Sequence, residues 1–241
     1  KELDCIFKSK PHEIYKIDTF LKSRGPIYSG NELDLSKYTL IYPVDIENKN
    51  FIIHCLGKDN NDDKYIAYEY RKEINNFFKY EFVNFYRKIN IISQINHPAI
   101  LKFIGFSPVN FVNKNNLVIV TEYYPDNYFF SNDNNLWNDT KKLIVIYGIA
   151  SAMSYLHSHD IIHRDLKLDN ILLDDYFLPK LFGFDLSKEI NDKYEGKSTH
   201  TKGTPAYLAP EIYLNNEYSK SSDVYAFAFI IYQIFSGNKG L

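Results

Sequence analysis

Hydrophobic positions after residue 37 fall into short runs of β-branched and aromatic residues. The runs cover 38–42, 50–56 and 64–70, and clusters of Asp, Asn, Lys and Gly separate them. Short apolar runs bounded by turn-forming residues are typical of antiparallel strands. We therefore predict three strands at the start of a sheet, and two more near 101–106 and 117–121.

Other parts of the chain have the spacing of helices. Between 73 and 95, Phe and Ile residues recur every three or four positions, and this pattern stops before Pro98, as expected for a helix. Further helices are predicted from 139 through 156 and over 224–235. A small sheet with one helix, followed by a mostly helical part, indicates an α+β fold. Residues 1–37 have weak periodicity, and we expect a flank of unknown role.

Composition excludes several classes of protein. Of the 241 residues, 45% are hydrophobic, including 21 Tyr and 18 Phe, which is enough apolar surface for a folded core. The net charge of −2 provides no overall basic field, so we expect no nucleic-acid partner. The two cysteines, Cys5 and Cys55, favour a reducing, cytoplasmic compartment. The longest apolar stretch is too short to span a bilayer, so no membrane segment is expected.

The strongest motif follows the helix predicted from 139. Residues 163–170 are His-Arg-Asp-Leu-Lys-Leu-Asp-Asn, which resembles the catalytic loop of protein kinases. The resemblance implies that Asp165 accepts the proton of the substrate hydroxyl. It also implies that Lys167 reaches the transferred phosphoryl group and that Asn170 holds a metal ion.

Other motifs stand in the order that the kinase family has. Residues 203–211 resemble the end of an activation segment, 222–229 the helix after it, 97–100 the turn after the αC helix, and 121–124 the hinge. The resemblance covers about 38–238. It is closest in type to the tyrosine-kinase-like group of Ser/Thr kinases, because Lys167 and the Gly-Thr-Pro of 203–205 follow a Ser/Thr pattern.

The resemblance implies a two-lobed protein-kinase fold. We expect a flank at 1–37, an N-lobe at 38–121 and a C-lobe at 122–241. Family members continue with several more helices, so the C-lobe is expected to be incomplete after a helix at about 222–236. The implied cofactors are ATP and Mg²⁺. The residues that the resemblance assigns to ATP are the adenine contacts Ala67 and Leu172 and the hinge residues Thr121, Glu122 and Tyr123.

The sequence departs from the family where ATP phosphates should bind. No glycine occurs between Tyr38 and Leu56, so the backbone has no glycine-rich cradle. The third strand should carry Ala-x-Lys, but the chain has Ala67-Tyr68-Glu69. A unit-charge pair is worth roughly 4 kcal/mol at about 4 Å and an effective dielectric near 20, so the reversed sign strongly disfavours phosphate. The alternative is a shift of register that brings Arg71 to this position.

The αC helix departs in the same sense. Its glutamate usually lies nine residues before the His of the His-Pro turn, and here that position is Lys88. We therefore hypothesise an ion pair with reversed charges between Glu69 and Lys88, which would join αC to the sheet without binding ATP. Glu81 is the alternative residue on a similar helix face, and Lys88 as a solvated surface lysine is the other interpretation.

The metal-binding triplet is inverted. The family's Asp-Phe-Gly corresponds to Gly183-Phe184-Asp185. Gly183 has no ligand for Mg²⁺, and Asp185 lies about 7 Å further along an extended chain. Asn170 remains as one weak ligand, and Asp185 could contribute only after local remodelling.

These departures predict a pseudokinase, catalytically impaired, with weak or absent ATP and Mg²⁺ binding. It would act as a regulatory or scaffold module for other signalling proteins, among them a partner kinase domain. One alternative is an active Ser/Thr kinase with rearranged metal and phosphate contacts, with Asp165 as base and Asp185 as metal ligand. The other is a degenerate, truncated domain without an independent role.

Overall fold

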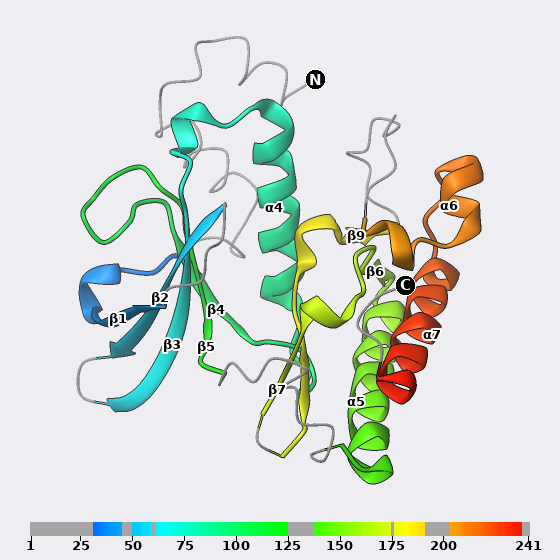
Figure 1. Ribbon diagram of the computed structural model, residues 1–241. Helices are drawn as coiled ribbons and strands as arrows, with labels where there is room; N and C mark the ends of the chain where they lie inside the picture. Colours follow the sequence, from blue (N-terminus) through cyan, green and yellow to red (C-terminus); the bar gives the residue numbers. More distant parts are fainter. Residues whose placement is uncertain are drawn as a thin grey trace. The chain divides into compact units, whose positions relative to one another are not determined.

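The computed structural model describes residues 31–44, 50–58, 61–124, 137–174, 176–190 and 203–237. They belong to two compact units (Figure 1). The first unit comprises residues up to Tyr86 together with Lys102–Tyr123, and the second comprises Arg87–Leu101 and the chain from Tyr124 onward. The predicted bounds of the N-lobe at 38–121 and the C-lobe at 122–241 stay predictions, and residues 87–101 belong to the second unit. The predicted flank 1–37 is described only from residue 31.

The first unit is built on a five-stranded antiparallel sheet with the order β1-β2-β3-β5-β4. The strands are β1 (Tyr38–Val44), β2 (Phe51–Lys58), β3 (Asn61–Tyr70), β4 (Phe103–Ser107) and β5 (Val118–Glu122). All five predicted strands are therefore confirmed. Ahead of β1, the chain adds to the sheet edge, because the Leu33 amide donates to the Phe106 carbonyl at 2.8 Å.

The two faces of this sheet have different neighbours. Ala67, Val118 and Val120 pack with Leu35 and Leu56 on one face. On the other face, the rings of Tyr70 and Phe106 contact Phe85, which lies in the first half of α4 (Lys79–Gln94). Successive residues of a strand point to opposite faces, so this alternation decides which side chains of β3 face α4.

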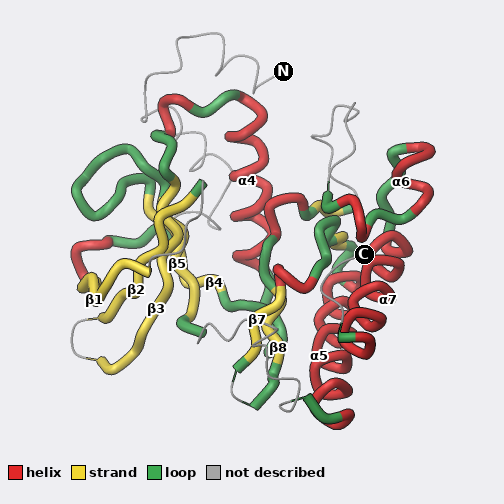
Figure 2. Tube along the Cα trace, viewed as in Figure 1, coloured by secondary structure: helices red, strands yellow, loops and turns green. Residues whose placement is uncertain are grey.

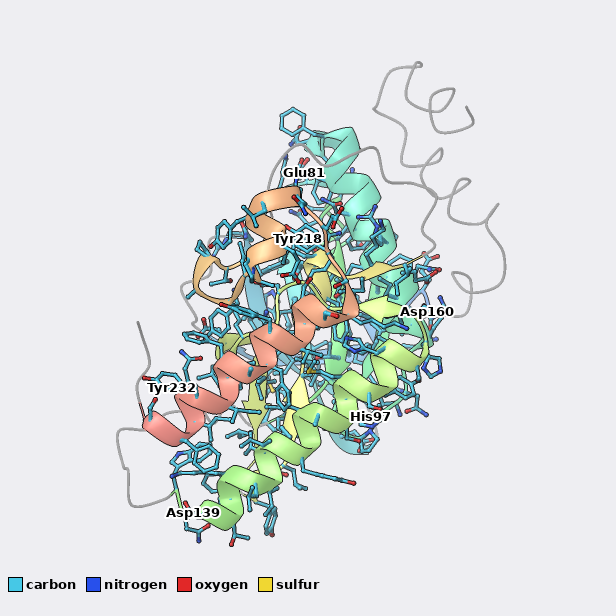
Figure 3. The ribbon with its side chains drawn as sticks, turned by 90° about the vertical axis from the view of Figure 1, so that its right-hand side faces the viewer. Glu81, His97, Asp139, Asp160, Tyr218 and Tyr232 are labelled. Carbon is cyan, nitrogen blue, oxygen red and sulfur yellow. The ribbon has the colours of Figure 1, made fainter. Side chains whose placement is uncertain are left out.

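The second unit is mainly helical (Figure 2). After α4 it contains α5 (Asp139–Ser158), α6 (Pro210–Asn215) and α7 (Lys220–Ser236), with two short strand pairs. The pairs are β6 (Ile161–Ile162) with β9 (Lys188–Glu189), and β7 (Ile171–Leu173) with β8 (Pro179–Leu181). The helices α5 and α7 lie side by side, as Figure 3 shows.

Capping residues set the helix ends that hydrophobic periodicity leaves open. The Asn138 side chain accepts from the Lys141 amide at the start of α5. Ser219 and Ser222 form a capping box that starts α7 four residues before the predicted bound. Gly237, with φ of +69°, ends α7. Buried residues of both helices, among them Ile149 and Ile230, form the core of the second unit.

This confirms the predicted α+β class and the two-lobed architecture. Among the described residues, no helix has both the length and the hydropathy to cross a bilayer.

Candidate functional site

The loop between β6 and β7 carries the predicted catalytic residues, and the structure brings them together. The carboxylate of Asp165 accepts a hydrogen bond from Nδ2 of Asn170 at 3.1 Å and forms an ion pair with Nζ of Lys167 at 3.1 Å. Asn170 also donates to the Asp165 carbonyl at 2.7 Å. Thr204 was not predicted as a site residue, but its hydroxyl donates to Asp165 at 2.8 Å and accepts from Lys167 at 2.9 Å. Its place in the Gly-Thr-Pro of 203–205 was the available signal.

Asp223, in the first turn of α7, holds the backbone of this loop. Its carboxylate accepts the amides of His163 at 2.8 Å and Arg164 at 2.9 Å. It also lies 3.0 Å from Nε2 of His157. Arg164 has a φ of +69°, a conformation that costs a non-glycine residue about 1–3 kcal/mol. The two charge-assisted bonds to Asp223, which is only 2% exposed, offset that strain.

His163 is fully buried and its burial lowers the pKa of the imidazole. Nε2 lies 3.0 Å from the Phe182 carbonyl and therefore donates to it. The ring packs 4.9 Å from the ring of Phe184. A neutral histidine thus links the loop to the inverted triplet, without a charge of its own.

Gly183 is fixed by its conformation and by a close neighbour. Its φ is +83°, and a Cβ added there would lie 2.5 Å from Cγ of Asn170. The side chain of Asn170 therefore fills the space beside position 183. An aspartate at this position would need both a strained backbone and a displaced Asn170.

Asp185 is bound by a lysine. Nζ of Lys88, from the second half of α4, donates to Oδ1 of Asp185 at 2.7 Å. Among the described residues, no group of three or more His, Cys, Asp or Glu side chains is placed to hold a metal ion. Gly183 has no side chain that could bind a metal ion, and the carboxylate of Asp185 is occupied by the Lys88 ammonium. These residues therefore do not fit the magnesium site that the family resemblance implies.

Glu69 lies in β3 and is buried in the first unit. Oε2 is 2.8 Å from Nε2 of His54, and Oε1 accepts Nδ2 of Asn110 at 2.7 Å. Burial raises the pKa of this carboxyl, but the hydrogen bonds from His54 and Asn110 outweigh it and leave the pKa lowered.

The strand register decides which face of the sheet Glu69 occupies. Glu69 pairs with Ile52 and Val118 in the strand register, and its neighbour Tyr70 contacts Phe85 of α4 on the opposite face. Glu69 therefore points away from the face on which α4 packs. On that face the β3 residue next to it is Tyr68.

The predicted ion pair between Glu69 and Lys88 stays a prediction, because the two residues belong to different units. Within its own unit, Glu69 binds His54 and Lys88 binds Asp185. The alternative helix residue, Glu81, binds Lys72 and accepts the Phe78 amide at 2.7 Å at the start of α4. The alternative strand residue, Arg71, follows β3 directly and its amide donates to the Asn50 carbonyl.

The predicted adenine and hinge residues are divided between the units. Ala67 is fully buried in β3, and Leu172 is half-buried in β7. Because they belong to different units, their joint contact with adenine stays a prediction. In the hinge, Thr121 donates to the Glu122 carbonyl at 3.1 Å, and Tyr123 lies under Nζ of Lys64 at 5.6 Å.

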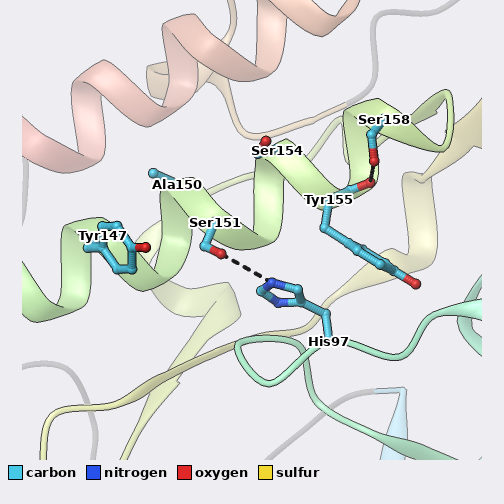
Figure 4. Close-up of a pocket in the computed structure, with 7 residues that line it drawn as sticks. All are labelled: His97, Tyr147, Ala150, Ser151, Ser154, Tyr155 and Ser158. Atoms are coloured by element: carbon cyan, nitrogen blue, oxygen red, sulfur yellow. Dashed lines mark hydrogen bonds between the residues drawn. The ribbon is translucent and has the colours of Figure 1, made fainter.

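A second feature of the helical unit is a shallow groove on α5, with a volume of about 510 Å³ (Figure 4). His97 lies at its edge, where Nε2 is 3.2 Å from the Ser151 hydroxyl and the ring is 5.1 Å from that of Tyr155. Burial lowers the pKa of His97. Apart from His97, which begins the turn at 97–100, the residues that line the groove belong to α5 and lie outside the motifs.

Comparisons with known proteins agree with the motifs. The family model of the protein kinase domain matches residues 51–240. The chain is 37% identical over 159 residues to a probable serine/threonine-protein kinase, gdt4, of Dictyostelium discoideum. It is 31% identical over 186 residues to the wall-associated receptor kinase-like 3 of Arabidopsis thaliana. These matches cover 63% and 74% of this chain but only 9% and 24% of the relatives, so the chain spans a small part of their length.

Proposed function

The chain belongs to the protein kinase family, and we propose that it is a pseudokinase: a catalytically impaired kinase domain that works as a regulatory or scaffold module in signalling. The observation that carries the proposal is the inverted triplet. Position 183 has no side chain and its space is filled by Asn170, and the carboxylate of Asp185 binds an ammonium. The proposal includes weak or absent binding of ATP with Mg²⁺.

The reaction of the family explains why this observation matters. Phosphoryl transfer depends on metal ions that bridge the phosphates and neutralise the developing charge, with little other chemistry for the protein to supply. Asp165, Lys167 and Asn170 are present to position a hydroxyl and a phosphate. Without a carboxylate at position 183 to hold the metal ion, the phosphates of ATP are not held in place, and these three residues have no phosphate to act on.

A function in binding other proteins needs only a folded surface, and the structural residues of the loop are intact. Asp223 still holds the loop backbone, and Thr204 still ties the 203–211 segment to Asp165. We therefore propose other signalling proteins as partners, a kinase domain among them. We also propose a cytoplasmic location, from the cysteine content.

A second candidate function is an active Ser/Thr kinase, and one observation favours it. Lys167, Thr204 and Asp165 form the closed network that would position a substrate hydroxyl. In this case, Asp185 would have to exchange Lys88 for a metal ion.

A thermal-shift measurement with ATP, with and without Mg²⁺, separates the two candidates. A ligand that binds only the folded state raises Tm by mass action. We expect no Mg²⁺-dependent rise and no transfer of labelled phosphate to protein substrates. A Mg²⁺-dependent rise, together with transfer that Asp165→Asn abolishes, would overturn the pseudokinase proposal. Asp165→Asn also serves as the control for contaminating kinases.

A further inference from the structure

Two polar contacts join the second half of α4 to the segment that follows β8. Nζ of Lys88 donates to Oδ1 of Asp185 at 2.7 Å, and Nδ2 of Asn90 donates to Oε1 of Glu189 at 3.2 Å. The partners are 97 and 99 residues apart along the chain. All four residues lie in the second unit, so the contacts are internal to it.

Lys88 and Asp185 differ in how far their charged groups are shielded from water. The Lys88 side chain is 15% exposed, and an ammonium held this far from water is costly unless it is paired. The Asp185 side chain is 53% exposed, so it could remain solvated without a partner. The Lys88 ammonium is the more buried of the two charges, so the pair matters most for Lys88.

The position of Asp185 is set by its neighbours in the chain. Phe184 is buried beside His163, and Gly183 is held against Asn170 in a left-handed conformation. The carboxylate is thus presented to α4 by a packed backbone. A preformed acceptor of this kind costs little entropy when the ammonium binds it.

We propose that Lys88 is a built-in cation for Asp185: its ammonium takes the place of a divalent metal ion at the inverted triplet and latches the second half of α4 to residues 183–189. The inference rests on the proposed function in one respect, that the domain works without a bound metal. A divalent ion would have to displace an ammonium already at hydrogen-bond distance. It would then find one carboxylate where the family supplies more ligands.

The latch has a consequence for regulation. In the proposed mechanism, no nucleotide and no metal is needed to hold the second half of α4 against residues 183–189. The surface that these elements form is then presented to partners at all times. Control would come from partners rather than from ATP.

A double-mutant cycle tests the latch in the 241-residue chain. Lys88→Asp and Asp185→Lys each place like charges together, and we expect each to lower Tm by about 2–4 °C, the effect of a loss near 1 kcal/mol in a protein of this size. The double variant should recover most of the loss, because the ion pair is restored with its signs exchanged. Hydrogen exchange of residues 183–189 should rise in the single variants and return in the double variant.

The ion pair of Lys220 with Asp160, at 2.6 Å, is the matched control. It too joins a lysine to an aspartate across the second unit, but its lysine is 40% exposed. Lys220→Asp should leave exchange at 183–189 unchanged. Losses that merely add in the Lys88 and Asp185 cycle would overturn the latch.

Magnesium provides an independent readout. We expect millimolar Mg²⁺ to leave both Tm and the exchange of residues 183–189 unchanged. A Mg²⁺-dependent protection of 183–189 that Asp185→Asn removes would overturn the latch, because the metal would then hold the carboxylate. If the chain transfers phosphate while the double variant still recovers stability, only the pseudokinase proposal is refuted. If the two single losses simply add and no phosphate is transferred, only the latch is refuted.

Discussion

Glu69 offers the sharpest test of how β3 is placed, through a substitution that would restore the family pattern. Glu69→Lys recreates Ala-x-Lys, so motif matching alone predicts a gain of ATP binding. The structure predicts a loss of stability instead. The new ammonium would enter a site where the side chain is 10% exposed and where the carboxylate now binds His54 and Asn110.

The magnitude follows from those two bonds. A hydrogen bond to a charged group contributes about 1.5–3 kcal/mol, and an uncompensated charge left in a buried site costs about 3–5 kcal/mol. We therefore expect Glu69→Lys to reduce the free energy of unfolding by about 3–5 kcal/mol, roughly 10 °C in Tm at this chain length. Glu69→Gln keeps the shape and one acceptor, and we expect a loss of about 1–2 kcal/mol.

The pH dependence provides a second readout. The folded pKa of Glu69 is lowered below its ordinary value of 4.5. Its ionised form therefore stabilises the protein above pH 4.5, and this contribution is lost as the pH falls through the lowered folded value. Because Glu69→Gln has no titrating group here, its stability should fall less steeply with acid than that of the natural protein.

Urea unfolding followed by circular dichroism, between pH 3 and 7, measures both effects. Thermal shift with ATP and Mg²⁺ is run on the same samples. The reasoning is refuted if Glu69→Lys is as stable as the natural chain or gains Mg²⁺-dependent stabilisation by ATP. Either result would mean that residue 69 faces the other side of the sheet.

Three further predictions concern the second unit. Gly183→Asp should lower the free energy of unfolding in urea by about 2–4 kcal/mol, because of its positive φ and its approach to Asn170. Gly237→Asp, with a similar φ and open space, should lower it by only about 1 kcal/mol. Equal costs would contradict the packing argument. His163→Phe should make the free energy of unfolding fall less steeply as the pH drops below 6.5. The folded pKa of His163 is lowered, so the unfolded chain binds more protons than the folded chain in this pH range. An unchanged slope would exclude His163 as its source. Asp223→Ala should lower the free energy of unfolding by at least about 3 kcal/mol, since two buried amides lose their acceptor. It should also increase hydrogen exchange in residues 163–170. Unchanged exchange would show that the loop is held by other contacts.

The sequence predicted those parts of the fold that local patterns determine. The five strands of the sheet lie between clusters of turn-forming residues, and α4, α5 and α7 follow from their hydrophobic spacing, so these elements were found within a few residues. The short elements α6 and β6 to β9 carry no such pattern and were not predicted. The catalytic loop was predicted from its resemblance to a contiguous family motif. Asp165, Lys167 and Asn170 lie within six residues, so their spacing alone brings them near each other.

The face of Glu69 could not be predicted from the motif. A shift of one residue moves a strand's side chains to the other face, and Ala67-Tyr68-Glu69 can match the family pattern in sequence while differing in register. The pairing of Glu69 with Val118, and of Tyr68 with Ile119, decides the face. That pairing depends on β5, almost fifty residues away. The partner of Lys88 was unpredictable for a similar reason, since Asp185 lies 97 residues away.

The presence of Asp165 in a chain whose position 183 is a glycine has a structural explanation. Its carboxylate is 17% exposed, and Asn170, Thr204 and Lys167 all donate to it. Removing it would leave a lysine and two polar side chains without their shared acceptor, in a loop that also carries the strained Arg164. A catalytic motif can therefore remain in the chain because it holds the loop together. By the same argument, an intact loop motif is weak evidence for catalysis unless the metal-binding triplet accompanies it.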